Sequence, residues 1–157
     1  MSETDPDGAR KRVGTSFYTS IMESVDYTDT FLTVALDSAA AGGTVPPGET
    51  VAALAYRMIT AHPYELRSSD IIFGVWADRN GIAEESRADA RRQFYARPRA
   101  CLRSSELGKK WGWGVHADDQ GRVMLYPVGS AEYERLAAGR GPDGRTVKVR
   151  PAMRSRR

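Results

Sequence analysis

The chain has 157 residues, a formal net charge of +3 and 41% hydrophobic residues. This length is typical of one domain that is large enough to bury its own core. No apolar run approaches the roughly 18–20 residues of a membrane helix, and the first dozen residues lack the apolar stretch of a signal peptide. A single cysteine rules out an internal disulfide, so we expect a cytoplasmic protein.

The positive charge is concentrated at the C-terminal end. Residues 139–157 contain seven basic residues and one acidic residue, whereas residues 28–138 contain 13 basic and 14 acidic residues. We therefore predict a mobile N-terminal extension over 1–27, a globular domain over 28–138 and a basic disordered tail over 139–157. Nucleic acid would be a partner only through this tail, and no membrane partner is expected.

The first half of the proposed domain contains one strand and one helix with clear patterns. Alternating β-branched and apolar residues predict a strand over 30–36. Apolar residues at helical spacing predict an amphipathic helix over 49–61, with Thr50 as its cap or first-turn residue. Pro63 ends this helix. His62 then lies at the helix C-terminus, where a capping role is favoured over a catalytic one.

The second half adds further elements. Residues 70–79 are apolar on both faces of an extended chain, which predicts a central strand. Residues 83–96 favour a surface helix, residues 112–117 and 122–128 form a hairpin, and residues 131–138 form a last helix. The predicted fold is thus a single α+β domain in the order β-α-β-α-β-β-α, with a mostly antiparallel sheet and helices packed on it.

The hairpin has a register that its turn defines. A type I turn at 118–121 with its glycine in the left-handed region pairs His116 with Met124 and Gly114 with Tyr126. Two interpretations of this face follow. Glycine beside His116 leaves a shallow floor for a ligand, or Tyr126 fills the space over Gly114, which is the favoured alternative.

Residues 100–117 hold the most distinctive side chains of the chain. Cys101 is the only cysteine and His116 is one of two histidines. A thiol nucleophile needs a base or a positive field, which His116 or the pair Lys109 and Lys110 would supply. A buried small hydrophobic role for Cys101 is favoured over catalysis. Cys101 and His116 are therefore weak catalytic candidates.

The same segment contains donors for an anion. Arg103 with the serine that follows it can hold a carboxylate or phosphate, and tryptophan beside lysine offers a stacking surface. The candidate ligand-binding residues are Arg103, Ser104, Lys109, Lys110, Trp111, His116 and Tyr126. Neither a glycine-rich phosphate loop nor metal-ligand spacing is present, so no cofactor and no metal are expected.

Several stretches carry a resemblance to a known family. The strongest are Cys101-Leu-Arg-Ser-Ser and Lys109-Lys-Trp-Gly-Trp-Gly-Val-His116, with others at Tyr27-Thr-Asp-Thr-Phe-Leu-Thr-Val34 and Ala61-His-Pro-Tyr64. They resemble a family of small bacterial proteins known only as a domain of unknown function. The resemblance covers about residues 27–136 and implies a compact domain without implying an activity.

Three functional hypotheses follow. The leading one is a domain that binds a small anionic or polar ligand beside residues 103–116. The alternative is a protein or nucleic-acid interaction module that uses the basic tail. The third is an enzyme with Cys101 or His116 as its reactive group.

Overall fold

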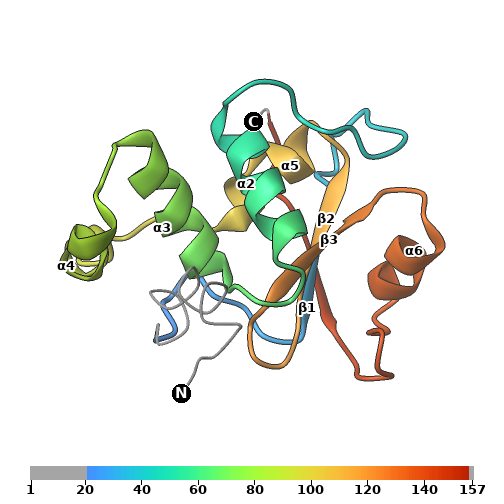
Figure 1. Ribbon diagram of the computed structural model, residues 1–157. Coiled ribbons are helices and arrows are strands. Elements are labelled where there is room, and N and C mark those ends of the chain that lie inside the picture. Colours follow the sequence, from blue (N-terminus) through green and yellow to red (C-terminus); the bar gives the residue numbers. More distant parts are fainter. Residues whose placement is uncertain (1–20, 156–157) are drawn as a thin grey trace, which may run out of the picture.

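The structure is a computed structural model that describes residues 21–155, so most of the predicted extension over 1–27 lies outside the described residues. A four-stranded sheet forms its centre in the order β3-β2-β1-β4 (Figure 1). The strands are β1 (Thr30–Thr33), β2 (Trp113–Ala117), β3 (Val123–Pro127) and β4 (Lys148–Pro151). β2 is antiparallel to both β1 and β3, and β4 is parallel to β1. The predicted α+β class with a mostly antiparallel sheet is confirmed.

Helices cover both faces of the sheet (Figure 1). The helices of the described chain are α2 (Val51–Ala61), α3 (Ser68–Arg79), α4 (Arg87–Phe94), α5 (Glu106–Lys109) and α6 (Ala131–Ala137), with short 3-10 turns η1 (Glu84–Ser86) and η2 (Leu102–Ser104). α4 packs on α3 and lies away from the sheet (Figure 1). The main core joins the sheet to α2 and α3. On the opposite face, Tyr133 of α6 packs edge-on against Phe31 of β1, with 5.0 Å between ring centroids.

The predicted strand over residues 70–79 is wrong, because this segment lies within helix α3. The backbone N–H of Arg67 donates to the Asp70 carboxylate at 2.8 Å, which satisfies one donor at the start of the helix. The buried residues of α3 join two separate clusters, one containing Ile71 and Val75 and the other Phe73 and Ala77. An apolar run that is buried on two sides shows no polar face, so periodicity alone fits a strand as well as a helix.

The predicted hairpin register is confirmed. His116 lies opposite Met124 and Gly114 lies opposite Tyr126. Gly121 has φ of 82° and provides the left-handed residue of the turn. The predicted cap of α2 is also present, since Thr50 Oγ1 accepts a hydrogen bond from the Ala53 N–H at 3.2 Å.

The tail that the sequence predicted to be disordered contains a strand of the sheet. Lys148–Pro151 forms β4, and the flanking Val147 and Ala152 are each only 4% exposed. Backbone pairing with β1 holds this segment, so its side chains need not be apolar. Lysine, arginine and proline are typical of an edge strand, and this composition hides a strand within a basic stretch. The ordered fold therefore extends past residue 138.

Candidate functional site

A cavity of about 320 Å³ lies between α2, α3, α4 and the segment 99–105 that follows α4. Its walls are mostly apolar, with Val51 and Ala55 from α2, Ile71, Val75 and Trp76 from α3, and Phe94 from α4. The aromatic rings of Trp76 and Phe94 lie 5.2 Å apart between centroids. The cavity therefore offers an apolar interior with a flat aromatic part.

A few polar groups also line the cavity. They include the guanidinium groups of Arg79 and Arg99, the thiol of Cys101 and the hydroxyl of Ser104. Arg99 donates from Nε to the Phe94 carbonyl at 2.8 Å, and its guanidinium carbon lies 3.9 Å from the centroid of the Phe94 ring. This stacking fixes the plane of the guanidinium group.

Cys101 is half-buried and its Sγ atom lies 3.2 Å from the hydroxyl of Tyr27. Burial raises the pKa of Tyr27, and the contact with Cys101 raises it further. The Tyr27 hydroxyl is therefore protonated at neutral pH and is able to donate to the sulfur.

A second cluster lies on the opposite face of the sheet. The Tyr64 hydroxyl is 2.8 Å from Nδ1 of His116 and 2.8 Å from the Tyr126 hydroxyl. Burial lowers the pKa of His116, and the nearby carboxylates of Asp118, Asp143 and Asp29 oppose this only in part. Burial likewise raises the pKa of Tyr64 far above its ordinary value. A neutral imidazole thus lies within a hydrogen-bonded set of phenols.

The glycines of this face are covered by protein. A Cβ atom on Gly114 would lie 2.4 Å from Cζ of Phe31 and 2.9 Å from Cε2 of Tyr133. A Cβ atom on Gly112 would lie 2.0 Å from the carbonyl oxygen of Gly42. The favoured interpretation placed Tyr126 over Gly114, whereas the atoms nearest to this position belong to the rings of Phe31 and Tyr133.

The predicted site residues do not gather in one place. Cys101 and Ser104 line the cavity on the α2 and α3 side. His116 and Tyr126 lie on the other face, because the neighbouring Val115 belongs to the main core and alternate residues of a strand face opposite ways. The sheet therefore separates Cys101 from His116.

The cationic candidates have structural contacts of their own. Arg103 donates from Nε to the Pro151 carbonyl at 2.8 Å and accepts at its own carbonyl from the Met153 N–H at 2.8 Å. These bonds hold η2 against the end of edge strand β4. The Lys110 ammonium lies 5.0 Å from the centroid of the Trp111 ring. Lys109, Lys110 and Trp111 are not among the described residues that line the cavity.

The sequence interpretation missed the α3 wall of the cavity. A strand over residues 70–79 would place Ile71 and Val75 on one face and Trp76 on the other. Ile71 and Val75 are four residues apart, as are Ile72 and Trp76, and all four line the cavity. This spacing also fits one side of a helix. The length of the apolar segment was the signal that favoured the helix, since α3 has 12 residues.

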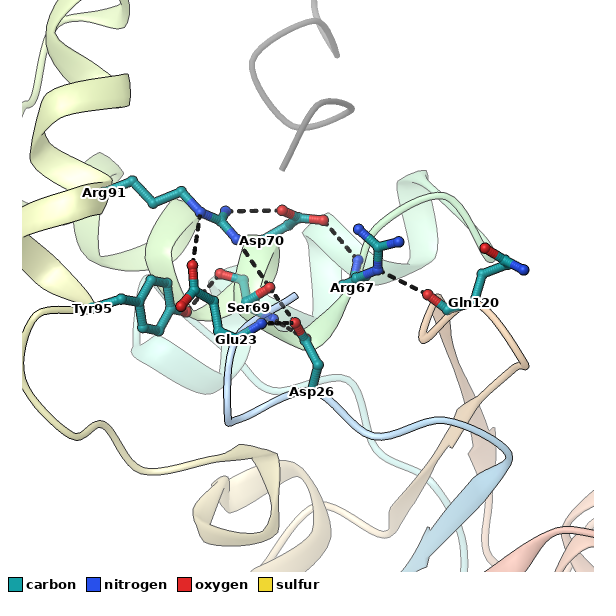
Figure 2. A network of polar contacts seen from close by, with 8 residues as sticks. All are labelled: Glu23, Asp26, Arg67, Ser69, Asp70, Arg91, Tyr95 and Gln120. Atoms are coloured by element: carbon teal, nitrogen blue, oxygen red, sulfur yellow. Dashed lines mark hydrogen bonds and ion pairs between the residues drawn. The ribbon is translucent and has the colours of Figure 1, made fainter. Parts of the chain in front are cut away.

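A polar network fixes the start of α3 next to α4 (Figure 2). Arg91 donates to the Asp70 carboxylate at 2.9 Å and to the Ser69 hydroxyl at 3.0 Å. Asp26 accepts from the Ser69 N–H at 2.8 Å and from its hydroxyl at 2.7 Å, while Tyr95 donates to the Ser69 carbonyl at 2.7 Å. Because Ser69 and Asp70 are buried, these bonds satisfy groups that water does not reach. The network thereby sets the distance between two walls of the cavity.

The fold is that of a single-domain α+β protein with a mostly apolar pocket between α2, α3, α4 and residues 99–105. A family of unknown function (DUF6157) matches residues 22–157, and the chain belongs to this family. No curated protein and no solved structure matches the chain. The matched range includes β4 and thus extends beyond the domain boundary predicted at residue 138.

Two further findings concern residues 21–155. None of the helices in this range is long and apolar enough to span a membrane. Within the same range, no group of three or more histidine, cysteine, aspartate or glutamate side chains is arranged to hold a metal ion.

Proposed function

We propose that the protein binds a small molecule with an apolar body in the cavity between α2, α3, α4 and residues 99–105. The cavity itself carries this proposal. Its volume of about 320 Å³ falls within the range of roughly 300–1,000 Å³ that is usual for ligand pockets. Such pockets combine mainly apolar walls with a few polar groups, as this one does.

The proposal keeps the small ligand expected from the sequence but moves its site. Of the residues first proposed, Ser104 lines the cavity, as does the weak catalytic candidate Cys101. Arg103 donates to the Pro151 carbonyl and does not line the cavity. His116 and Tyr126 share their hydrogen bonds with Tyr64 on the other face. The apolar walls supply the main binding force, because removing apolar surface from water is favourable.

A neutral fluorescent probe tests the proposal. N-phenylnaphthylamine becomes brighter in an apolar environment, so titration into the protein reports entry into the cavity. Val51 lines the cavity and is 55% exposed, and Val51→Trp should therefore narrow the opening and weaken binding. Val45 is 57% exposed and does not line the cavity, so Val45→Trp is the matched control.

The single cysteine gives an independent readout. Iodoacetamide alkylates Cys101, and the probe should slow this reaction because the thiol lines the same cavity. Equal probe affinity in Val51→Trp and Val45→Trp, with no protection of Cys101, would contradict the proposed function.

A further inference from the structure

We infer that the ligand of this cavity carries an anionic group that the guanidinium groups of Arg79 and Arg99 bind. This inference rests on the proposed function and adds the chemical class of the ligand, an acid with a flat apolar body. Three observations support it: the charge of the lining, the contacts of the two arginines and the position of the aromatic rings.

The lining of the cavity is positively charged. Arg79 and Arg99 both belong to it, and the described residues that line it include no aspartate or glutamate. The nearby carboxylate of Glu49 instead pairs with Arg57 at 3.0 Å. An anion that enters the cavity therefore meets two positive charges and no negative side chain on its walls.

The contacts of the two arginines leave most of their donors unused. Five other arginines in the described part of the chain pair with carboxylates, namely Arg57, Arg87, Arg91, Arg92 and Arg145. In the same part of the chain, Arg79 instead donates from Nη1 to the Glu49 carbonyl at 3.1 Å, and Arg99 donates from Nε to the Phe94 carbonyl at 2.8 Å. Each of these guanidinium groups has five N–H donors, so most donors of Arg79 and Arg99 are available for a carboxylate or sulfonate.

The aromatic rings lie next to these charges. Arg99 stacks on Phe94, whose ring also neighbours that of Trp76. Trp76 and Arg79 are three residues apart on α3, so they lie on the same side of this helix. A flat apolar body against Trp76 and Phe94 would thus place its acidic group beside Arg79 and Arg99. Arg79 is exposed and Arg99 is half-buried, so the acidic group binds at the open side of the cavity.

Two probes with the same apolar body separate charge from shape. Anilinonaphthalene sulfonate carries an anionic group that N-phenylnaphthylamine lacks. We expect the anionic probe to bind the wild-type protein about tenfold more tightly or better, because a hydrogen-bonded charge contributes more than a neutral contact. Raising the salt concentration should weaken binding of the anionic probe and leave binding of the neutral probe unchanged.

Variants assign the effect to the two arginines. Arg99→Gln and Arg79→Gln should each lower the affinity for the anionic probe about tenfold while affinity for the neutral probe stays within twofold. Arg79→Gln is needed beside Arg99→Gln because Arg99 also packs on Phe94. Arg57→Gln makes the same charge change outside the cavity and should alter neither affinity.

The outcomes distinguish the inference from the proposed function. Equal binding of both probes, blocked by Val51→Trp and unaffected by either cavity arginine variant, would overturn the anionic class and leave the pocket intact. Binding that Val51→Trp does not affect would overturn both. A wild-type dimer that Val51→Trp converts to a monomer in light scattering, without probe binding, would make a second copy the occupant and would also overturn both.

Discussion

The hydroxyl of Tyr64 lies 2.8 Å from Nδ1 of His116, an imidazole that is only 3% exposed. Tyr64 adopts φ of 56°, in the left-handed region that costs a non-glycine residue about 1–3 kcal/mol. Its backbone N–H donates to the Val123 carbonyl at 3.0 Å, and its hydroxyl also contacts Tyr126. These bonds offset the unfavourable backbone and tie the loop after α2 to the hairpin.

Replacing Tyr64 with phenylalanine should therefore destabilise the fold. Tyr64→Phe removes the hydroxyl and leaves the buried imidazole of His116 without this partner, which costs about 1–3 kcal/mol. Urea denaturation followed by circular dichroism measures the change in free energy of unfolding. Tyr56→Phe is the control, because Tyr56 packs on Trp113 and its hydroxyl makes no hydrogen bond within the described residues. A similar loss in both variants would contradict the role assigned to the Tyr64 hydroxyl.

The stability of the fold should depend on pH through His116. Burial lowers the pKa of His116 below its value of about 6.5 in an unfolded chain. Between these two pKa values the unfolded chain binds more protons than the folded chain. The stabilisation that neutral His116 gives the fold is therefore fully present above about pH 6.5 and is lost as the pH falls below this value. The free energy of unfolding should decline there by up to about 1.4 kcal/mol per pH unit.

Comparison of two histidine variants isolates this effect. His116→Gln should remove the decline of the free energy of unfolding below about pH 6.5. His62→Gln should keep this decline, since His62 lies outside the buried cluster and contacts Glu65. Urea midpoints measured across this pH range test the difference. An unchanged slope in His116→Gln would show that another group titrates.

Local sequence signals were sufficient for the hairpin and for α2. Gly121 marks the one left-handed position of the turn, and the alternation around it sets the register without any tertiary information. Thr50 and Pro63 likewise bound α2 through short-range chemistry. α3 and β4 depend instead on distant partners. α3 is buried between two clusters, and β4 is held by pairing with a strand about 118 positions earlier in the chain, as Thr30 pairs with Lys148.

The candidate site was predictable only in part for the same reason. Composition drew attention to residues 100–117, and Cys101 and Ser104 of this segment do line the cavity. The other walls come from α2, α3 and α4, whose approach follows from packing that spacing along the chain does not encode. In a strand, Trp76 and Arg79 would face opposite ways, whereas in helix α3 they lie on the same side.

Gly114 should not tolerate even one added methyl group. A Cβ atom there would lie 2.4 Å from Phe31 and 2.9 Å from Tyr133, and both rings are buried. Gly114→Ala should cost about 1–3 kcal/mol because the packed rings must move. Gly42→Ala is the control, since its added Cβ would have no neighbour within 4 Å. Thermal denaturation gives the melting temperatures of the two variants. Equal melting temperatures for Gly114→Ala and Gly42→Ala would contradict the tight packing over Gly114.

The buried ion pair of Figure 2 should matter far more than an exposed one. The side chains of Arg91 and Asp70 are 12% and 3% exposed. Arg91→Met leaves the Asp70 carboxylate buried without this partner and should cost about 3–5 kcal/mol. Arg92 pairs with Asp89 at the surface, so Arg92→Met should change stability by less than about 1 kcal/mol. If urea denaturation shows a similar loss in the free energy of unfolding for Arg91→Met and Arg92→Met, the buried pair has no special role.

Deleting residues 148–157 should unfold the protein or lower its melting temperature strongly. The deletion removes all pairing of β4 with β1, the buried Ala152 and the Pro151 carbonyl that Arg103 contacts. The double variant Lys148→Gln/Arg150→Gln is the control, because it removes charge from β4 and keeps its backbone bonds. We expect it to melt near the wild-type temperature, since its side chains are exposed. Differential scanning calorimetry measures both proteins. A truncated chain that unfolds cooperatively at the wild-type temperature would mean that this segment is a dispensable tail.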